Sequence, residues 1–385
     1  LPDSVGGRYD IADFSVKGSW FDAGNKFSVS DFSVRTKSDV SGRGAFSADG
    51  LGKALDAKNW SSVSARFEAS LQSVPIERVP DYWPRSAAPD VHQWVADNIT
   101  QGFAPAGSIE MTFSGTEHGL NLDSLNASLQ IENARVAYMD DMPAVENVKA
   151  ALNFTKSDLS IVLIDGHTDG VSLQKGTLVF SGLNAAVTDF ILNTDLETND
   201  LSDVFKILSS PALQITQAAF INPDNVSGRG KANFRLTFPM KGGPIDPADV
   251  RVSVIADVEN VDLSHYLIDA LNIQSAAAHL ELTEQEMHLT GTGKMRTGDM
   301  NFTLYQAFTN PPAVVTDLKA SAVLTDEARA DLNIDLLNPP NVAGGIPADF
   351  ALQFFNDKTG KATVALDLTP ADIDAIFITH EHIDH

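Results

Sequence analysis

Hydrophobic and polar residues alternate with a period of two along most of the chain. Ile109, Met111 and Phe113, for example, are separated by Glu110 and Thr112. Because successive side chains of a strand point to opposite faces of a sheet, this period predicts strands with one buried and one exposed face. The same alternation recurs in later segments, at Phe234, Leu236 and Phe238, at Val252 and Val254, at Leu280 and Leu282, and at Met287 and Leu289.

Short polar segments separate the alternating stretches. Residues 156–158, Lys-Ser-Asp, lie between the apolar pairs Leu152/Phe154 and Leu159/Ile161. Tight polar turns between short strands are typical of antiparallel meanders. Asp31 interrupts another alternating stretch, and we expect a break in strand register at this residue.

Helical patterns are few. Residues 89–98 place Val91, Trp94 and Val95 on one helical face, with Pro89 at the first position and Gly102 just beyond the end. Two more short helices are predicted, at 201–208, where Ser202 or Asp203 contributes near the start, and at 263–271. So few helices cannot cover a sheet of this length. The predicted fold class is therefore all-β, a mainly antiparallel, elongated open β-groove or rolled sheet with a few short helices.

Composition and charge exclude several function classes. The 385 residues include 27 Lys and Arg against 51 Asp and Glu, which gives a formal net charge of −24. A surface this acidic repels phosphate backbones, so we expect no nucleic-acid partner. Cysteine is absent, which excludes disulfides, thiolate nucleophiles and cysteine-based metal sites. No signal peptide and no stretch of about 18 apolar residues is visible in the sequence. Because the sequence begins at Leu1, we expect a fragment whose membrane anchor lies outside it.

Several segments are similar to a known family. Residues 81–84, Asp-Tyr-Trp-Pro, precede the expected helix at 89–98, and residues 136–150 read Val-Ala-Tyr-Met-Asp-Asp-Met-Pro-Ala-Val-Glu-Asn-Val-Lys-Ala. Together with 173–178 and 230–239, they resemble the AsmA-like envelope proteins, in particular the YhdP-like branch, which is related to TamB and to bridge-like lipid-transfer proteins. The resemblance runs over about residues 5 to 365.

The resemblance implies a function and a location. It implies a periplasmic β-groove that conducts phospholipid, or another acyl-chain ligand, between inner- and outer-membrane components, with an inner-membrane anchor outside this fragment. It implies no covalent chemistry and no cofactor. We expect groove regions at residues 1–240 and 241–368, followed by a separate tail at 369–385.

The expected lipid-contacting residues are the large apolar side chains of the alternating stretches. A closed β core, serving as a non-catalytic scaffold for protein partners, is the alternative explanation for the same residues. Arg43, Arg229 and Lys231 are candidates for contacting lipid phosphates, or are ordinary surface residues. The groove candidates are Ile109, Met111, Phe113, Leu129, Ile131, Phe154 and Phe234.

The last residues carry a different motif. His380, His382, Asp384 and His385 follow a short apolar stretch and resemble the H-x-H-x-D-H signature of the metallo-β-lactamase superfamily. Imidazole and carboxylate ligands suit Zn²⁺, and the resemblance implies a metal site and a metal-dependent hydrolase as an alternative function. The signature lacks the downstream ligands of that superfamily, because the sequence stops at His385. We therefore expect no catalytic residue in this chain.

Overall fold

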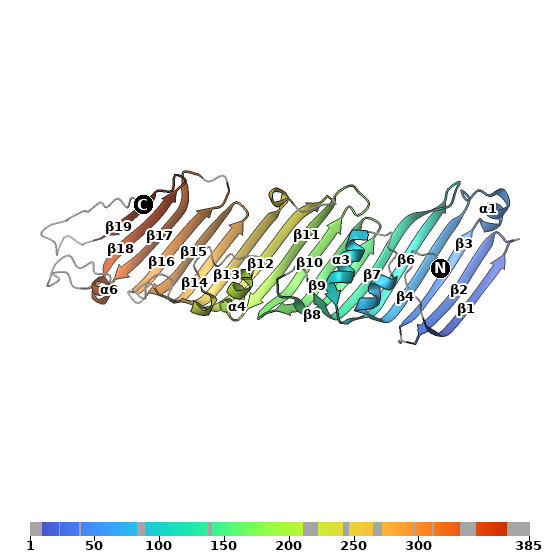
Figure 1. Cartoon of the computed structure of the whole chain (residues 1–385), viewed down its shortest axis with the longest axis horizontal. Coiled ribbons are helices and arrows are strands. Elements are labelled where there is room, and N and C mark those ends of the chain that lie inside the picture. Colours follow the sequence, from blue (N-terminus) through green and yellow to red (C-terminus); the bar gives the residue numbers. More distant parts are fainter. Residues whose placement is uncertain are drawn as a thin grey trace. The chain divides into compact units, whose positions relative to one another are not determined.

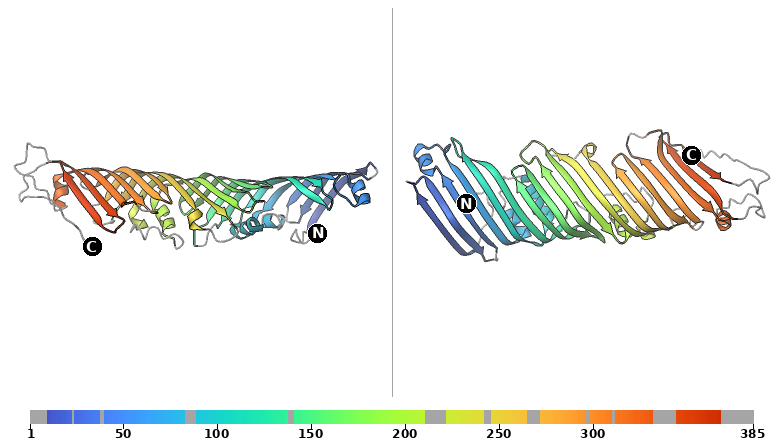
Figure 2. Two further views of the ribbon diagram at one scale, coloured as in Figure 1. Left: turned by 90° about the horizontal axis from the view of Figure 1, so that it is seen from above. Right: turned by 180° about the vertical axis from the view of Figure 1, so that it is seen from behind.

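A computed structural model describes most of the chain. The described residues are 10–22, 24–37, 40–82, 89–137, 141–210, 222–241, 246–264, 272–295, 298–309, 312–331 and 344–367. Nineteen strands in these ranges belong to one antiparallel sheet (Figures 1 and 2). This confirms the predicted all-β fold class with few helices.

The chain divides into two compact units. Unit 1 comprises Leu1–Thr168, Leu173–Thr194 and Thr237–Asp249, and unit 2 comprises Asp169–Ser172, Asp195–Leu236 and Val250–His385. Each unit is a single layer of sheet in its described residues. The strands whose residues all lie in unit 1 are β1 (Ile11–Phe21), β2 (Lys26–Thr36), β3 (Ser41–Asp49), β4 (Ser64–Pro75), β5 (Ile99–Thr100), β6 (Phe103–Gly115), β7 (Leu120–Val136), β8 (Val145–Thr155) and β9 (Asp158–Thr168).

Unit 2 contains a second run of consecutive antiparallel pairs, from β13 to β19. Three further strands contribute residues to both units: β10 (Val171–Ser181), β11 (Thr188–Thr198) and β12 (Val226–Met240). The strands of unit 2 are β13 (Arg251–Leu263), β14 (Ile273–Thr283), β15 (Glu286–Met295), β16 (Gly298–Ala307), β17 (Val314–Leu324), β18 (Ile346–Phe355) and β19 (Gly360–Leu366).

Two of the predicted helices form at the predicted residues, as α3 (Pro89–Asn98) and α4 (Leu201–Leu208). The side chain of Asp200 caps α4 by accepting a hydrogen bond from the backbone N–H of Ser202, and the two predicted residues Ser202 and Asp203 lie in the first turn of the helix. The predicted helix at 263–271 lies largely outside the described residues. The remaining helices within the described ranges are α1 (Leu51–Ala57), α2 (Val79–Tyr82), α6 (Asp326–Asp331) and the 3₁₀ turns Ile76–Arg78, Pro223–Asn225 and Pro247–Asp249.

Strand register separates the side chains of unit 1 into two chemically different faces. Directly paired residues point to the same face, and the pairs Phe67–Met111 and Met111–Leu125 define what we call the apolar face. The neighbouring pairs Ser70–Ser108 and Ser108–Ser128 define the polar face. A register shift between Val29 and Phe32 preserves this alternation across Asp31, as the sequence predicted.

Glycines beneath aromatic rings flatten the apolar face. A Cβ atom at Gly44 would lie 2.6 Å from the ring of Phe32 and 2.4 Å from the carbonyl oxygen of Glu68. The absence of a side chain lets the ring of Phe32 stack with Phe67, with ring centroids 6.1 Å apart and an interplanar angle of 20°. Unit 2 repeats this arrangement, since a Cβ at Gly291 would lie 2.6 Å from the ring of Phe302.

The helix α3 covers part of the apolar face of unit 1 (Figure 1). Val95 and Ile99 are buried in one cluster with Ile131 and Val148, and Trp94 packs against that cluster. Gly102 adopts a φ of 84° directly after this segment, and a Cβ there would lie 2.6 Å from the carbonyl oxygen of Glu132. A glycine therefore lets the chain pass from α3 back into the sheet.

Candidate functional site

The apolar face of unit 1 is the candidate ligand surface. On β6 and β7, four directly paired rows point to this face: Phe113–Leu122, Met111–Leu125, Ile109–Ala127 and Gly107–Leu129. All eight residues are half-buried, and none of them carries a charge. Side chains of this kind are normally buried in a soluble protein, so the rows form a large apolar surface that the described residues leave incompletely covered.

Six of the seven predicted groove residues lie together on this face. Ile109, Met111 and Phe113 come from β6, and Leu129 and Ile131 come from β7. Phe154 of β8 pairs with Ala127 and therefore belongs to the same row as Ile109. Five of the six are half-buried, whereas Ile131 is only 4% exposed because it packs in the cluster with α3.

Unit 2 has an apolar face of the same design. One row runs directly from strand to strand through Leu280, Leu289, Leu304, Leu318 and Leu352. These leucines are half-buried. Phe234, the seventh predicted groove residue, alternates along β12 with the exposed Asn233 and Arg235, and lies on the same side as Gly230. The Cβ position of Gly230 faces Leu201 of α4 and Val258 of β13, which places Phe234 on the helix-covered side of unit 2.

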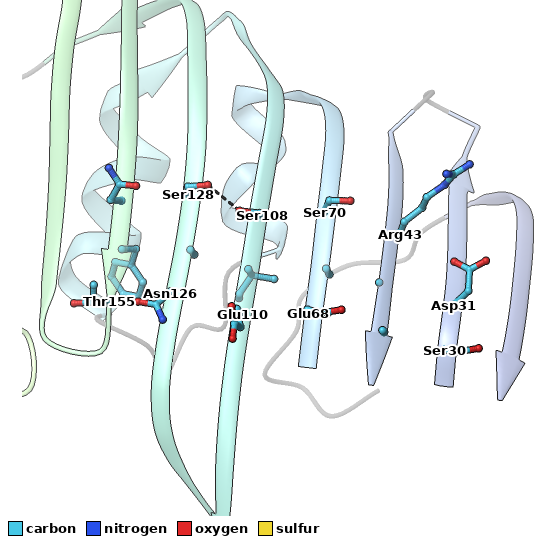
Figure 3. A pocket seen from close by; sticks show the side chains of 17 residues that line it. Ser30, Asp31, Arg43, Glu68, Ser70, Ser108, Glu110, Asn126, Ser128 and Thr155 are labelled. Atoms are coloured by element: carbon cyan, nitrogen blue, oxygen red, sulfur yellow. Dashed lines mark hydrogen bonds between the residues drawn. The ribbon is translucent and has the colours of Figure 1, made fainter. Parts of the chain in front are cut away.

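The polar face of unit 1 is hollowed on the opposite side of the same strands. The hollow has a volume of about 590 Å³, and Figure 3 shows the side chains that line it on successive strands. A row of short polar residues crosses it by direct pairing, from Arg43 through Ser70, Ser108 and Ser128 to Asn153. The hydroxyls of Ser108 and Ser128 are hydrogen-bonded at 2.8 Å. The hollow is open to water, and its lining combines these hydroxyl, amide and charged groups with apolar residues that include Ala45, Ala69 and Ala127.

Charged groups on the polar faces pair with one another. In unit 1, Arg66 donates to Glu110 at 2.8 Å. In unit 2, His279 Nδ1 donates a hydrogen bond to the carboxylate of Asp257 at 2.7 Å, and this bond raises the pKa of His279. The ammonium group of Lys319 donates to Asp317 at 2.9 Å and lowers the pKa of that carboxyl. Such exposed pairs contribute little to stability individually.

The basic residues that were candidates for lipid phosphates lie on the polar side. Arg43 pairs directly with Ser70 on the polar face of unit 1. Arg229 and Lys231 alternate with Gly230, so they point away from α4, and they form ion pairs with Glu259 at 2.6 Å and Glu197 at 3.1 Å. Their ordinary surface role is therefore the better interpretation.

The described residues offer no metal centre. No group of three or more His, Asp or Glu side chains among them is arranged to hold a metal ion. The predicted metal ligands His380, His382, Asp384 and His385 lie outside the described residues. None of the helices in the described part of the chain is long and apolar enough to cross a membrane.

Several residues of the apolar face were not singled out from the sequence. Phe46 and Phe67 form one row with Met111 and Leu125, and Leu152 continues the row of Leu129. The signal was present, because each lies at an alternating apolar position. Choosing among such positions requires the strand register, which the alternation alone does not give.

Comparisons with known proteins give one match. A family model described as YhdP protein matches residues 5–369. It confirms the family resemblance of the main part of the chain, and it ends before the histidine-rich tail. No curated protein and no solved structure matches the chain.

Proposed function

Because this chain belongs to the YhdP family of AsmA-like bacterial envelope proteins, we propose that its apolar face shields the acyl chains of phospholipid during transport between the two membranes of the envelope. The observation that carries the proposal is the apolar face itself, which the described residues leave incompletely covered. Its paired rows in β6 and β7 are half-buried and uncharged, and a matching leucine row crosses unit 2.

The physical basis is the removal of methylene groups from water. Each methylene buried against the sheet contributes about 0.8 kcal/mol, and no polar group needs a fixed partner. A row of Leu, Met and Phe side chains therefore holds an acyl chain without fixing its position along the row. Such a surface suits a ligand that has to slide, because the contacts at one row resemble those at the next.

The polar face has the complementary role of remaining in contact with water. Its hydroxyl, amide and paired charged groups keep the outer side of the same strands in water, while the apolar face carries the chains (Figure 3). The role needs no covalent step and no cofactor. We place this segment in the periplasm, with phospholipid and components of the inner and outer membranes as its partners.

The experiment is organic extraction of the purified, detergent-free chain followed by lipid mass spectrometry. We expect near-stoichiometric phospholipid in the wild-type chain. Met111→Asp should lower the bound lipid about tenfold or more, because an unpaired carboxylate against an acyl chain costs several kcal/mol. Thr112→Asp is the matched control, since Thr112 is the next residue on β6 and points to the polar face.

Each outcome decides between the proposal and its rivals. An empty wild-type chain with an unchanged β-sheet circular dichroism spectrum would overturn the proposal and favour the protein-binding scaffold. Equal lipid loss in Met111→Asp and Thr112→Asp would also count against it, because binding would then not depend on the apolar face. Phe113→Asp tests the same face independently if Met111→Asp does not fold.

A further inference from the structure

Two neighbouring rows of side chains form the floor of the hollow on the polar face of unit 1. Each row crosses β3, β4, β6, β7 and β8 by direct pairing. Most of these side chains are short, so the sheet is hollowed where the rows cross it, to a volume of about 590 Å³. The first row is Arg43, Ser70, Ser108, Ser128 and Asn153, and the second is Ala45, Glu68, Glu110, Asn126 and Thr155.

Several polar groups in the hollow have hydrogen-bonding capacity that the sheet does not use. Among the described residues, the side chains of Ser70, Asn126 and Asn153 have no hydrogen-bond partner, and all three are exposed. The hydroxyls of Ser108 and Ser128 bond to each other at 2.8 Å, which leaves one hydroxyl proton and further lone pairs unused. The hollow therefore offers both donors and acceptors to a ligand that has both.

The balance of charge in the hollow favours a neutral ligand. The carboxylates of Glu68 and Glu110 lie 3.5 and 2.8 Å from the guanidinium of Arg66, which neutralises part of their charge. Arg43 lies at the β3 end of the hollow, near Asp31 of β2 (Figure 3). The net charge of −24 repels polyanions, and no excess of one charge in the hollow attracts a charged polymer. A ligand of hydroxyl groups matches this lining.

The spacing of the rows indicates the shape of the ligand. The hydroxyls of Ser70, Ser108 and Ser128 recur once per strand, at an interval of about 4.8 Å across the sheet. An extended peptide repeats every 6.8 Å or so on one side and does not keep this interval. A β-1,4-linked glycan advances by about 5 Å per sugar, close to the spacing of neighbouring strands, and carries hydroxyls along both edges of a flat ribbon. Rotation about its glycosidic bonds lets such a ribbon follow the twist of the sheet.

We propose that the hollow on the polar face of unit 1 binds a neutral, linear β-1,4-linked glycan that lies across the strands with one sugar on each strand. Ser70, Ser108 and Ser128 bind successive sugars, and Arg43 and Asn153 bind the two ends of the bound stretch. The site goes beyond the proposed function, because it lies on the side of the strands opposite the apolar face.

Binding of short glycans to the full 385-residue chain, titrated by saturation-transfer difference NMR, tests the site. The probe is cellopentaose. Maltopentaose is its matched control, because it contains the same sugars in α-1,4 linkage and coils instead of forming a flat ribbon, and cellobiose tests the effect of length. Ser108→Lys places a long side chain in the hollow. Ser114→Lys makes the same change further along β6, on the same face but outside the hollow.

We expect cellopentaose to bind about tenfold more tightly than either maltopentaose or cellobiose. Ser108→Lys should weaken the binding of cellopentaose about tenfold or more, whereas Ser114→Lys should leave it unchanged. Ser70→Lys fills the hollow independently if Ser108→Lys does not fold. Arg43→Gln should weaken binding severalfold without lowering the melting temperature, because the Arg43 side chain has no ion pair or hydrogen bond among the described residues.

Three results would overturn the proposal. The first is a folded wild-type chain that does not bind cellopentaose. The second is equal affinity for cellopentaose and maltopentaose, because the match between the sugar repeat and the strands would then have no effect. The third is a dimer in sedimentation velocity that Ser108→Lys dissociates, which would assign the hollow to a second copy of the chain. None of these results changes the amount of phospholipid on the apolar face, so the proposed function is tested separately.

Discussion

The two faces of the sheet in unit 1 differ in what covers their side chains. On the polar face, Arg66 pairs with Glu110, and Ser108 with Ser128, so the groups satisfy one another and water completes the rest. On the apolar face, Met111 and Leu125 pair with each other and remain half-buried. The side chains on the polar face of these strands therefore find hydrogen-bond partners in the sheet and in water. The side chains on the apolar face, in contrast, are incompletely buried.

This difference is the reason why we propose the apolar face as the ligand surface. An antiparallel sheet normally packs one face against a second layer and exposes the other to water. Here the helix α3 supplies such cover only over the buried cluster that contains Ile131 and Val148. The half-buried rows beyond it have the composition of a core. Under the proposed function, an acyl chain supplies the contacts that a second layer would otherwise make.

The largest expected effect is the difference in stability between a substitution in the covered part of the apolar face and one on the polar face. Ile131→Ala removes a side chain that is 4% exposed in the cluster with α3, and should destabilise the chain by about 2–5 kcal/mol. Gln130→Ala, at the adjacent exposed position of β7, should change stability by less than about 0.5 kcal/mol. Urea unfolding followed by circular dichroism gives both values. Equal effects of the two substitutions would show that the faces do not differ in packing.

A smaller loss of stability is expected when a glycine that packs under an aromatic ring of the apolar face is replaced. Gly44→Ala would place a Cβ atom 2.6 Å from the ring of Phe32 and 2.4 Å from the carbonyl oxygen of Glu68. The resulting overpacking should cost about 1–3 kcal/mol. Gly119→Ala is the control, because no heavy atom lies within 4 Å of its Cβ position. A thermal melt in which Gly44→Ala is as stable as Gly119→Ala would contradict the close stacking of Phe32 on β3.

The smallest effect concerns a charged pair of the polar face in unit 2. The hydrogen bond that His279 donates to the carboxylate of Asp257 raises the pKa of His279 above its ordinary value of about 6.5. Protonated His279 therefore stabilises the fold at pH values below that ordinary pKa, and the contribution disappears as the pH rises through the raised pKa of the folded state. Proton NMR titration should show the His279 pKa returning toward its ordinary value in Asp257→Asn. An unchanged pKa in that variant would rule out the pair as the cause.

The sequence predicted the strands and the helix α3 because both depend on local periodicity. The alternation around Met111 and the apolar spacing of Trp94 and Val95 are readable without any tertiary contact. The sequence alone did not predict how far each apolar position is buried by other elements. Ile131 and Met111 occupy equivalent alternating positions, yet Ile131 is buried in the cluster with Val95 of α3 and Met111 is half-buried. The difference arises from where α3 packs on the sheet.

The pairing of charges was equally hidden from the sequence. Arg229 and Lys231 suggested a phosphate site, but β12 directs them to the side away from α4, where Glu259 and Glu197 pair with them. Their alternation with Gly230 predicts that both point to the same side of β12. Their partners Glu259 and Glu197 lie about 30 residues away in the sequence, on other strands, and the alternation does not identify them. The predicted metal ligands from His380 to His385 remain a prediction, since they lie outside the described residues.

The most direct test of the central claim compares two adjacent residues of one strand. Phe67 of β4 points to the apolar face and Arg66 to the polar face, as their pairing with Met111 and Thr112 shows. Benzoylphenylalanine is placed at one position or the other, and the chain is irradiated with vesicles that contain radiolabelled phosphatidylethanolamine. We predict lipid adducts at position 67 and none above background at position 66. Equal labelling at both positions, or labelling at 66 alone, would contradict an apolar face that carries acyl chains.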